Sequence, residues 1–186
     1  MKRISNLRRI SKANSSGFTL VELLVVISII GLLAGLGFPA INGAMKAGKK
    51  AEVAATAEAI KTSINAFYAE YSSYPTNSNG QPFTSTDSNF FSVMCKGSTN
   101  SGNYRGISFL EIPPKYTNSN GIVTPSGFLS KNAQTNFFIA IDATNLGYVI
   151  PKNTPGTGVT NTNVSAAVAV WVDDPSVKGR AVGTFK

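Results

Sequence analysis

The chain has 186 residues with 17 basic and 9 acidic side chains, a single cysteine and no histidine. Without histidine, Ser-His-Asp triads and histidine-ligated metal sites are excluded, and one cysteine excludes an internal disulfide. The sequence also contains no Gly-x-x-x-x-Gly-Lys-Ser/Thr phosphate-binding loop. We therefore predict a protein that is not an enzyme.

Residues 1–16 are polar and basic and contain no acidic side chain. Basic residues beside an apolar segment keep that side of the segment in the cytoplasm. We therefore expect a cytoplasmic N-terminus and an external C-terminal domain. The five basic residues of this leader are Lys2, Arg3, Arg8, Arg9 and Lys12.

An apolar segment of 21 residues follows at 18–38, and its one charged residue is Glu22. A helix of this length rises about 30 Å, which matches the hydrocarbon core of a bilayer. We interpret it as a single transmembrane helix. A secretory signal peptide would have a shorter apolar segment, followed by an Ala-x-Ala-like cleavage site. A twin-arginine signal, which residues 8–9 could suggest, would also need a cleavage site after the apolar segment. Residues 35–39 are not such a site. A plain signal anchor stays open as an alternative.

Glu22 needs a partner in this segment. A carboxylate at the centre of a membrane helix costs roughly 2.5–3.5 kcal/mol, and less near the end. No basic residue lies within two helical turns on its C-terminal side. We therefore expect its partner to come from elsewhere.

A glycine, an aromatic residue and a glutamate stand together in the string Gly17-Phe18-Thr19-Leu20-Val21-Glu22. This string resembles the processing and assembly signal of the type IV prepilin family, which includes type IV pilins and type II secretion pseudopilins. The resemblance covers residues 1 to about 75. It implies cleavage between Gly17 and Phe18 by a prepilin peptidase and N-methylation of Phe18. It also implies assembly roles for Phe18, Glu22 and Pro39.

Cleavage before Phe18 would create an ammonium group four residues from Glu22. Opposite charges attract far more strongly in a low dielectric than in water. If subunits stagger along a filament axis, the amine of one neutralises Glu22 of the next, and Glu22 sets the register. Removal of the leader also lowers the net charge from +8 to +3. Most of the basic signal for nucleic-acid binding disappears with it, and no nucleic acid partner is expected.

Residues 39–75 predict an amphipathic continuation of the helix. Pro39 lacks an N–H and should kink or loosen it, and Pro75 should end it near Tyr74. For the basic cluster 46–50 we expect a solvated face, with lipid headgroup contact as the alternative. Apolar residues recur at spacings of three and four, which predicts one buried face formed by Val53, Ala57, Ile60, Ile64, Phe67, Tyr71 and Tyr74.

Residues 76–135 are rich in Asn, Ser, Thr and Gly. The string Thr-Asn-Ser-Asn-Gly occurs at 76–80 and at 117–121, and both copies predict turns because Asn-Gly favours positive φ. The apolar stretches 90–94 and 107–112 predict short helices or irregular turns. Cys95 is expected to be a buried small hydrophobic residue.

The last third predicts strands. We predict a hairpin from residues 136–141 and 146–150, which flank a turn. We predict a third strand at residues 165–172 and a short edge strand at residues 181–185. We expect an α+β fold, in which the long N-terminal helix packs against an antiparallel sheet of three to four strands. The expected organisation is a leader at 1–17, a transmembrane and filament-core helix at 18–38, and a periplasmic domain formed by 39–75 and 76–186.

Asp142, Asp173 and Asp174 are the only acidic residues after Glu111. Major pseudopilins of type II secretion often hold calcium between late strands, and the resemblance implies a calcium site at these three residues. Calcium takes six to eight oxygen ligands. The family's Pro-Trp-Gly-Asn-Pro segment is absent, and the alternative is that these aspartates start turns. No other cofactor is expected.

We predict a structural subunit of a type II secretion pseudopilus, which serves protein export. Many type IV pilins carry a C-terminal disulfide, and the lone Cys95 departs from that pattern. The alternatives are a type IV pilin of a surface pilus, for adhesion, motility or DNA uptake, and a membrane-anchored binding module. The expected location is the bacterial inner membrane before assembly and a filament afterwards. The resemblance implies these partners: further copies of the chain, prepilin peptidase, minor pseudopilins, an assembly platform and a cytoplasmic ATPase, with membrane lipid before assembly.

Overall fold

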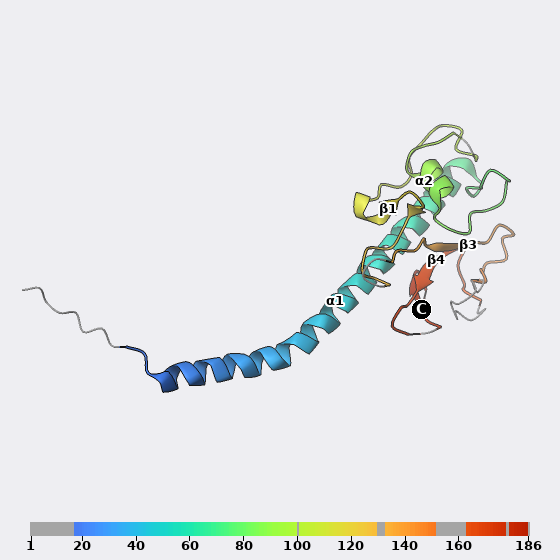
Figure 1. Ribbon diagram of the computed structural model, residues 1–186. Helices are drawn as coiled ribbons and strands as arrows, with labels where there is room; N and C mark the ends of the chain where they lie inside the picture. Colours follow the sequence, from blue (N-terminus) through green and yellow to red (C-terminus); the bar gives the residue numbers. More distant parts are fainter. Residues whose placement is uncertain (1–16, 100, 130–132, 152–162, 178, 186) are drawn as a thin grey trace, which may run out of the picture. The chain divides into compact units, whose positions relative to one another are not determined.

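A computed structural model describes residues 17–99, 101–129, 133–151, 163–177 and 179–185 (Figure 1). The basic leader and most of the loop before the third predicted strand lie outside these ranges. The chain divides into two compact units, Met1–Gly43 and Ala44–Lys186. The elements are α1 (Leu20–Tyr71), α2 (Ser88–Met94), a 3-10 turn (Pro114–Tyr116), β1 (Thr117–Asn118), β2 (Gly121–Ile122), β3 (Phe138–Ile141), β4 (Val168–Asp173) and β5 (Ala181–Gly183).

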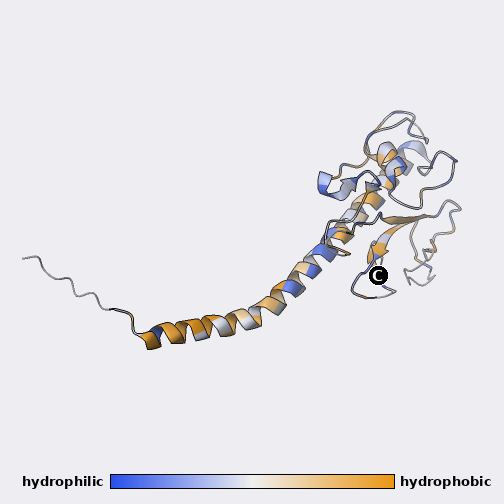
Figure 2. Cartoon of the chain, viewed as in Figure 1, coloured by the Kyte–Doolittle hydropathy of each residue, from blue (hydrophilic) through white to orange (hydrophobic). Residues whose placement is uncertain are grey.

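The first unit contains the apolar start of α1. Apolar residues follow one another around the whole helix here, as the orange ribbon of Figure 2 shows. Its large side chains are exposed, including Leu20 at 79% and Leu32 at 66%. A helix that is apolar on every side needs an apolar surrounding. By length and composition, this helix is able to cross a membrane. The helix continues through Pro39, whose missing N–H removes one backbone hydrogen bond.

The second unit is organised around the later part of α1. The predicted apolar face is confirmed, because Val53, Ala57, Ile60, Ile64 and Phe67 are all 0% exposed. These side chains share one core with residues of the strands, among them Phe137, Ile139, Val168, Val170 and Val172. The predicted α+β arrangement, a long helix packed against an antiparallel sheet, is therefore confirmed.

The helix ends at Tyr71, three residues before the predicted end. Ser72 adopts a left-handed conformation with φ of 51°, which the helix cannot continue through. Tyr74 still packs against the core from outside the helix, and its ring lies 4.5 Å from that of Tyr68, centroid to centroid. The apolar periodicity therefore extended past the last helical turn.

The main sheet has three antiparallel strands in the order β3-β4-β5. In its register Ile139 pairs with Val170, and Val172 pairs with Val182. Side chains alternate between the faces of a strand. The valines of β4 therefore point into the helix core, while Ala169 and Trp171 form a smaller cluster on the opposite face.

The predicted hairpin between 136–141 and 146–150 is wrong. β3 pairs with β4, and Val149 instead forms an isolated bridge with Val164. The physical reason is the turn after β3. The carboxylate of Asp142 accepts hydrogen bonds from the backbone N–H of Thr144 and of Gly147, which redirects the chain. The third and fourth predicted strands are confirmed as β4 and β5 with shifted ends.

Both copies of Thr-Asn-Ser-Asn-Gly form turns, as predicted. In each copy, the side chain of the first asparagine accepts a hydrogen bond from the backbone N–H two residues later. Asn77 accepts from Asn79 in the first copy, and Asn118 accepts from Asn120 in the second. The second copy connects β1 and β2, which pair antiparallel. The apolar stretch 90–94 lies in α2, whose N-terminus is capped by the carboxylate of Asp87. The stretch 107–112 is irregular.

The two turns provide a matched test of backbone packing. Gly80 and Gly121 both have positive φ, at 73° and 109°, but only Gly121 has backbone atoms of Thr86 and Asp87 where a Cβ would lie. Gly80→Ala should destabilise the fold by about 1–2 kcal/mol through its φ alone. Gly121→Ala should cost about 1–3 kcal/mol more because of the clash. Urea unfolding followed by Trp171 fluorescence measures both, and equal losses would contradict the role of the close approach.

Candidate processing and assembly site

Thr19 and Glu22 form a hydrogen-bonded box at the start of α1. The backbone N–H and the hydroxyl of Thr19 both donate to Oε2 of Glu22, at 2.8 and 2.7 Å. The backbone N–H of Glu22 donates to the Thr19 hydroxyl oxygen at 3.2 Å. This is a capping box, which satisfies backbone donors that a helix N-terminus leaves free. Glu22 therefore has an intrachain partner on its N-terminal side.

The sequence prediction does not include this partner, because it rests on basic side chains on the C-terminal side of Glu22, and Thr19 is neutral and precedes it. The signal was present, since Thr-x-x-Glu before an apolar run is the sequence pattern of a capping box. A neutral hydrogen-bond partner satisfies the carboxylate oxygen without neutralising its charge. The charge of Glu22 thus remains available to an ammonium group.

The predicted cleavage site lies just outside the helix. Gly17, Phe18 and Thr19 precede Leu20, the first helical residue, and all three are exposed. The Phe18 side chain is 79% exposed. The peptide bond between Gly17 and Phe18 is therefore not held in helical hydrogen bonding, which leaves it open to a peptidase. The same cap places Glu22 in the first turn, where the helix dipole favours negative charge.

The structure does not bring the three predicted calcium ligands together. Asp142 lies where β4 begins, because its N–H donates to the carbonyl of Ala167, whereas Asp173 is the last residue of β4. Six strand residues separate those ends by about 17 Å. Within the described ranges, no three acidic or cysteine side chains form a group that would hold a metal ion.

Each aspartate has its own surroundings. Backbone N–H groups of Leu146 and Gly147 hold the pKa of Asp142 below its usual value. Burial raises the pKa of Asp174, but hydrogen bonds from Lys50 and Ser176 outweigh it and leave the pKa lowered. Burial raises the pKa of Asp173, whose Oδ1 is buried without a hydrogen-bond partner among the residues that the structure describes.

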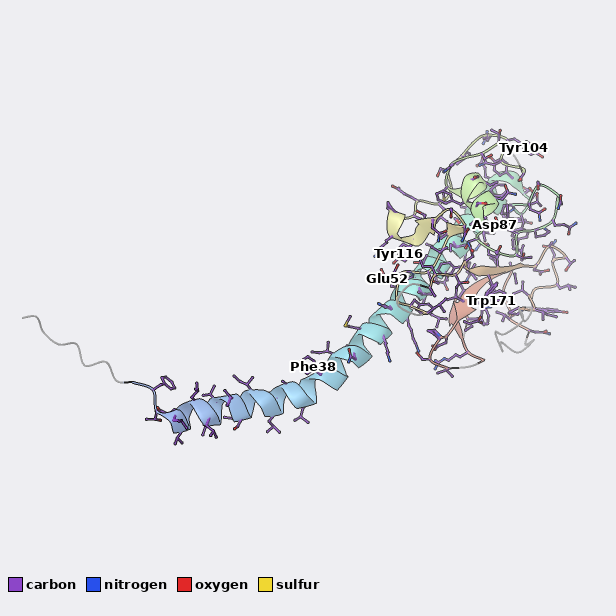
Figure 3. The ribbon with its side chains drawn as sticks, viewed as in Figure 1. Phe38, Glu52, Asp87, Tyr104, Tyr116 and Trp171 are labelled. Atoms are coloured by element: carbon purple, nitrogen blue, oxygen red, sulfur yellow. The ribbon has the colours of Figure 1, made fainter. Side chains whose placement is uncertain are left out.

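Glu52 ties the 3-10 turn to α1. Its Oε1 accepts hydrogen bonds from Nζ of Lys115 and from the hydroxyl of Tyr116, both at 2.5 Å. Figure 3 shows the labelled Glu52 and Tyr116 next to each other. The bonds from Lys115 and then Tyr116 lower the pKa of Glu52. No sequence pattern predicted this cluster, because Glu52 lies more than 60 residues before Lys115 and Tyr116.

Glu52→Gln should make stability less dependent on pH. A carboxylate with a lowered folded pKa stabilises the fold above its unfolded pKa, and this contribution is lost as pH falls through the folded pKa. We expect the variant to be less stable by about 1 kcal/mol at pH 7, and the difference to shrink towards pH 3. Thermal unfolding across this range measures it. Glu58→Gln is the control, because Glu58 is half exposed and, among the residues that the structure describes, pairs only with Lys61, at 3.5 Å. A difference that does not vary with pH would contradict the assignment.

Cys95 is half-buried and packs against the core. Burial raises the pKa of its thiol to about 11. A thiol with such a pKa is protonated at neutral pH and is a poor nucleophile. The structure thus supports a packing role for this residue.

Comparison with known proteins finds similarity concentrated at the N-terminus. Residues 12–38 match the family model described as "Prokaryotic N-terminal methylation motif". A fimbrial protein of Neisseria meningitidis is 34% identical over 61 residues, which are 33% of this chain and 36% of that protein. A fimbrial protein of Moraxella nonliquefaciens is 43% identical over 49 residues, which are 26% of this chain and 32% of that protein.

One similarity extends further into the second unit. The type IV major pilin protein PilA of Myxococcus xanthus is 27% identical over 107 residues, which are 56% of this chain and 49% of that protein. The chain thus matches about a third to a half of the length of these relatives. No solved structure matches the chain with significance. The methylation motif, these relatives and the long helix followed by small antiparallel sheets together support a type IV prepilin-like family for this chain.

Proposed function

We propose that this chain is a structural, non-enzymatic subunit of a type IV pilus-like filament. In this proposal a prepilin peptidase cleaves between Gly17 and Phe18 and methylates the new amino group of Phe18. The observation that carries it is the capped helix start, which leaves this bond exposed at the end of a helix able to cross a membrane. The matched methylation motif covers the same residues.

The apolar helix has two successive surroundings in this proposal. Before assembly, residues 18–38 cross the inner membrane, with the leader in the cytoplasm and the second unit in the periplasm. After assembly, the same residues pack against helices of other copies in the filament core, around Pro39 and Glu22. An assembly platform and a cytoplasmic ATPase supply the energy for extraction from lipid, because the chain has no phosphate-binding loop.

Two kinds of filament fit these features. A surface pilus is supported by the relatives, which are named fimbrial proteins and type IV major pilins. A type II secretion pseudopilus, with minor pseudopilins as partners, is supported by the single cysteine, which permits no C-terminal disulfide. Shearing of intact cells separates them. A shed filament containing this chain supports the pilus, whereas loss of protein secretion on deletion, without shed filaments, supports the pseudopilus.

The N-terminus of the protein from native membranes tests the shared part of the proposal. Intact mass and terminal-peptide mass spectrometry should find a chain that starts at N-methylated Phe18. A chain that still carries Met1, in cells with an active prepilin peptidase, would contradict processing at this site and favour a plain signal anchor.

A further inference from the structure

The lysines that follow the apolar segment line a pocket in the second unit. Lys46, Lys49 and Lys50 form one wall, and residues 127–129 and 175–176 form the others. The pocket has a volume of about 210 Å³. The lining also includes the apolar residues Phe128, Leu129 and Pro175 and the polar residue Ser176. Such a mixture suits a small anionic group that is attached to an apolar body.

The charges around this pocket are not balanced. Lys50 pairs with Asp174 at 2.8 Å, and the side chain of Asp174 is 2% exposed. Lys49 donates to the carbonyl oxygen of Gly127 at 3.1 Å, a neutral partner. Among the described residues, neither Lys46 nor Lys49 has a carboxylate within ion-pair distance. Both ammonium groups therefore remain available to an added anion.

Backbone geometry keeps one of these ammonium groups in place. Gly127 has φ of 77°, and a Cβ there would overlap Nζ of Lys49. A glycine at this position therefore lets the lysine reach the carbonyl. The hydrogen bond holds the Lys49 ammonium group at the pocket wall, so that less side-chain entropy is lost when an anion binds.

The position of the lysines in the chain indicates that the anion belongs to the headgroup layer of the membrane. Lys46 follows the end of the apolar segment by eight residues, which in a helix rise about 12 Å. Side chains on a helix lean towards its N-terminus, which in the proposed orientation is the membrane side. Long lysine side chains reach further towards the headgroup layer, which is about 5–8 Å thick on each side. Met45, directly before them, is 58% exposed.

We propose that this pocket binds the phosphate group of an anionic phospholipid while the subunit is in the membrane. The inference rests on the proposed membrane-spanning function. Lys46 and Lys49 neutralise the phosphate. The contact holds the second unit at the membrane surface until extraction, when the phosphate is released.

The test uses the full chain in mixed micelles of phosphatidylglycerol and phosphatidylethanolamine. Native mass spectrometry counts the lipids of each kind that remain bound. We expect the wild type to retain phosphatidylglycerol preferentially. Lys46→Gln and Lys49→Gln should each reduce this preference about fivefold, and Lys46→Arg with Lys49→Arg should restore it.

The double variant Lys61→Gln with Lys96→Gln is the matched control. It removes two charges away from the pocket, as many as Lys46→Gln and Lys49→Gln remove together, and its lipid preference should stay at the wild-type value. An equal loss in this control would show general charge attraction and overturn the proposed site. Wild-type lipid preference in the pocket variant, combined with failed assembly, would assign the lysines to carboxylates of a neighbouring copy and also overturn it.

Failure of this inference is distinguishable from failure of the proposed function. Flotation of the full chain with vesicles of the same two lipids reports membrane insertion independently of headgroup preference. A chain that floats but does not prefer phosphatidylglycerol overturns only the headgroup site. A chain that does not float overturns the membrane-spanning function itself.

Discussion

Glu22→Gln and Glu22→Ala are expected to reduce filament yield by at least tenfold while leaving membrane insertion unchanged. In the proposed filament, Glu22 neutralises the Phe18 amine of a neighbouring copy. Removing one partner of a buried ion pair costs about 3–5 kcal/mol, because the other charge is left unpaired. Insertion should persist, since the substitutions remove a charge from the apolar segment. Fractionation of membranes and quantification of sheared or overexpressed filaments measure the two effects.

Thr19→Val separates the charge of Glu22 from its capping role. This variant removes the hydroxyl that both accepts from and donates to Glu22, but it keeps the carboxylate. Loss of a cap costs only about 0.5–2 kcal/mol of helix stability. We therefore expect Thr19→Val to assemble better than Glu22→Gln. Normal filaments from Glu22→Ala would refute the register role.

Phe67→Ala should destabilise the second unit by about 3–5 kcal/mol, the usual cost of emptying a large buried aromatic site. Phe67 is 0% exposed, and its ring centroid lies 4.6 Å from that of Tyr71 and 5.2 Å from that of Phe109. These contacts join α1 to the irregular stretch after α2. Urea unfolding of the full chain in detergent, followed by the fluorescence of Trp171, measures the loss.

Tyr104→Ala is the control for this substitution. Its side chain is 81% exposed and touches the same cluster only at the edge of Tyr71, with ring centroids 6.3 Å apart. Figure 3 shows the labelled Tyr104 at the periphery of the second unit. We expect a change below about 1 kcal/mol. Equal losses for both variants would contradict a core centred on Phe67.

Local patterns were sufficient for features that depend on neighbouring residues. The buried face from Val53 to Phe67 follows from a spacing of three and four, which any helix places on one side. The two Asn-Gly turns follow from the conformations that these residues prefer. The capping box of Thr19 and Glu22 is also local, and the sequence contains its Thr-x-x-Glu pattern.

Pairing between distant segments could not be predicted in the same way. Residues 146–150 have the composition of a strand, yet β3 pairs with β4, because side-chain hydrogen bonds of Asp142 turn the chain away. The Glu52 cluster and the lysine pocket join residues more than 60 positions apart. No local pattern encodes such contacts.

The sequence by itself determined the apolar segment, the helix, its buried face and the candidate cleavage site, since each depends on residues within a few turns. Only the tertiary structure decided which strands pair, that Asp142 and Asp173 lie at opposite ends of β4, and that Lys46, Lys49 and Lys50 line a pocket. The physical reason is that these contacts form only when the sheet packs against α1. Local sequence patterns do not distinguish between possible strand partners, and packing of the strands against the helix selects one of them.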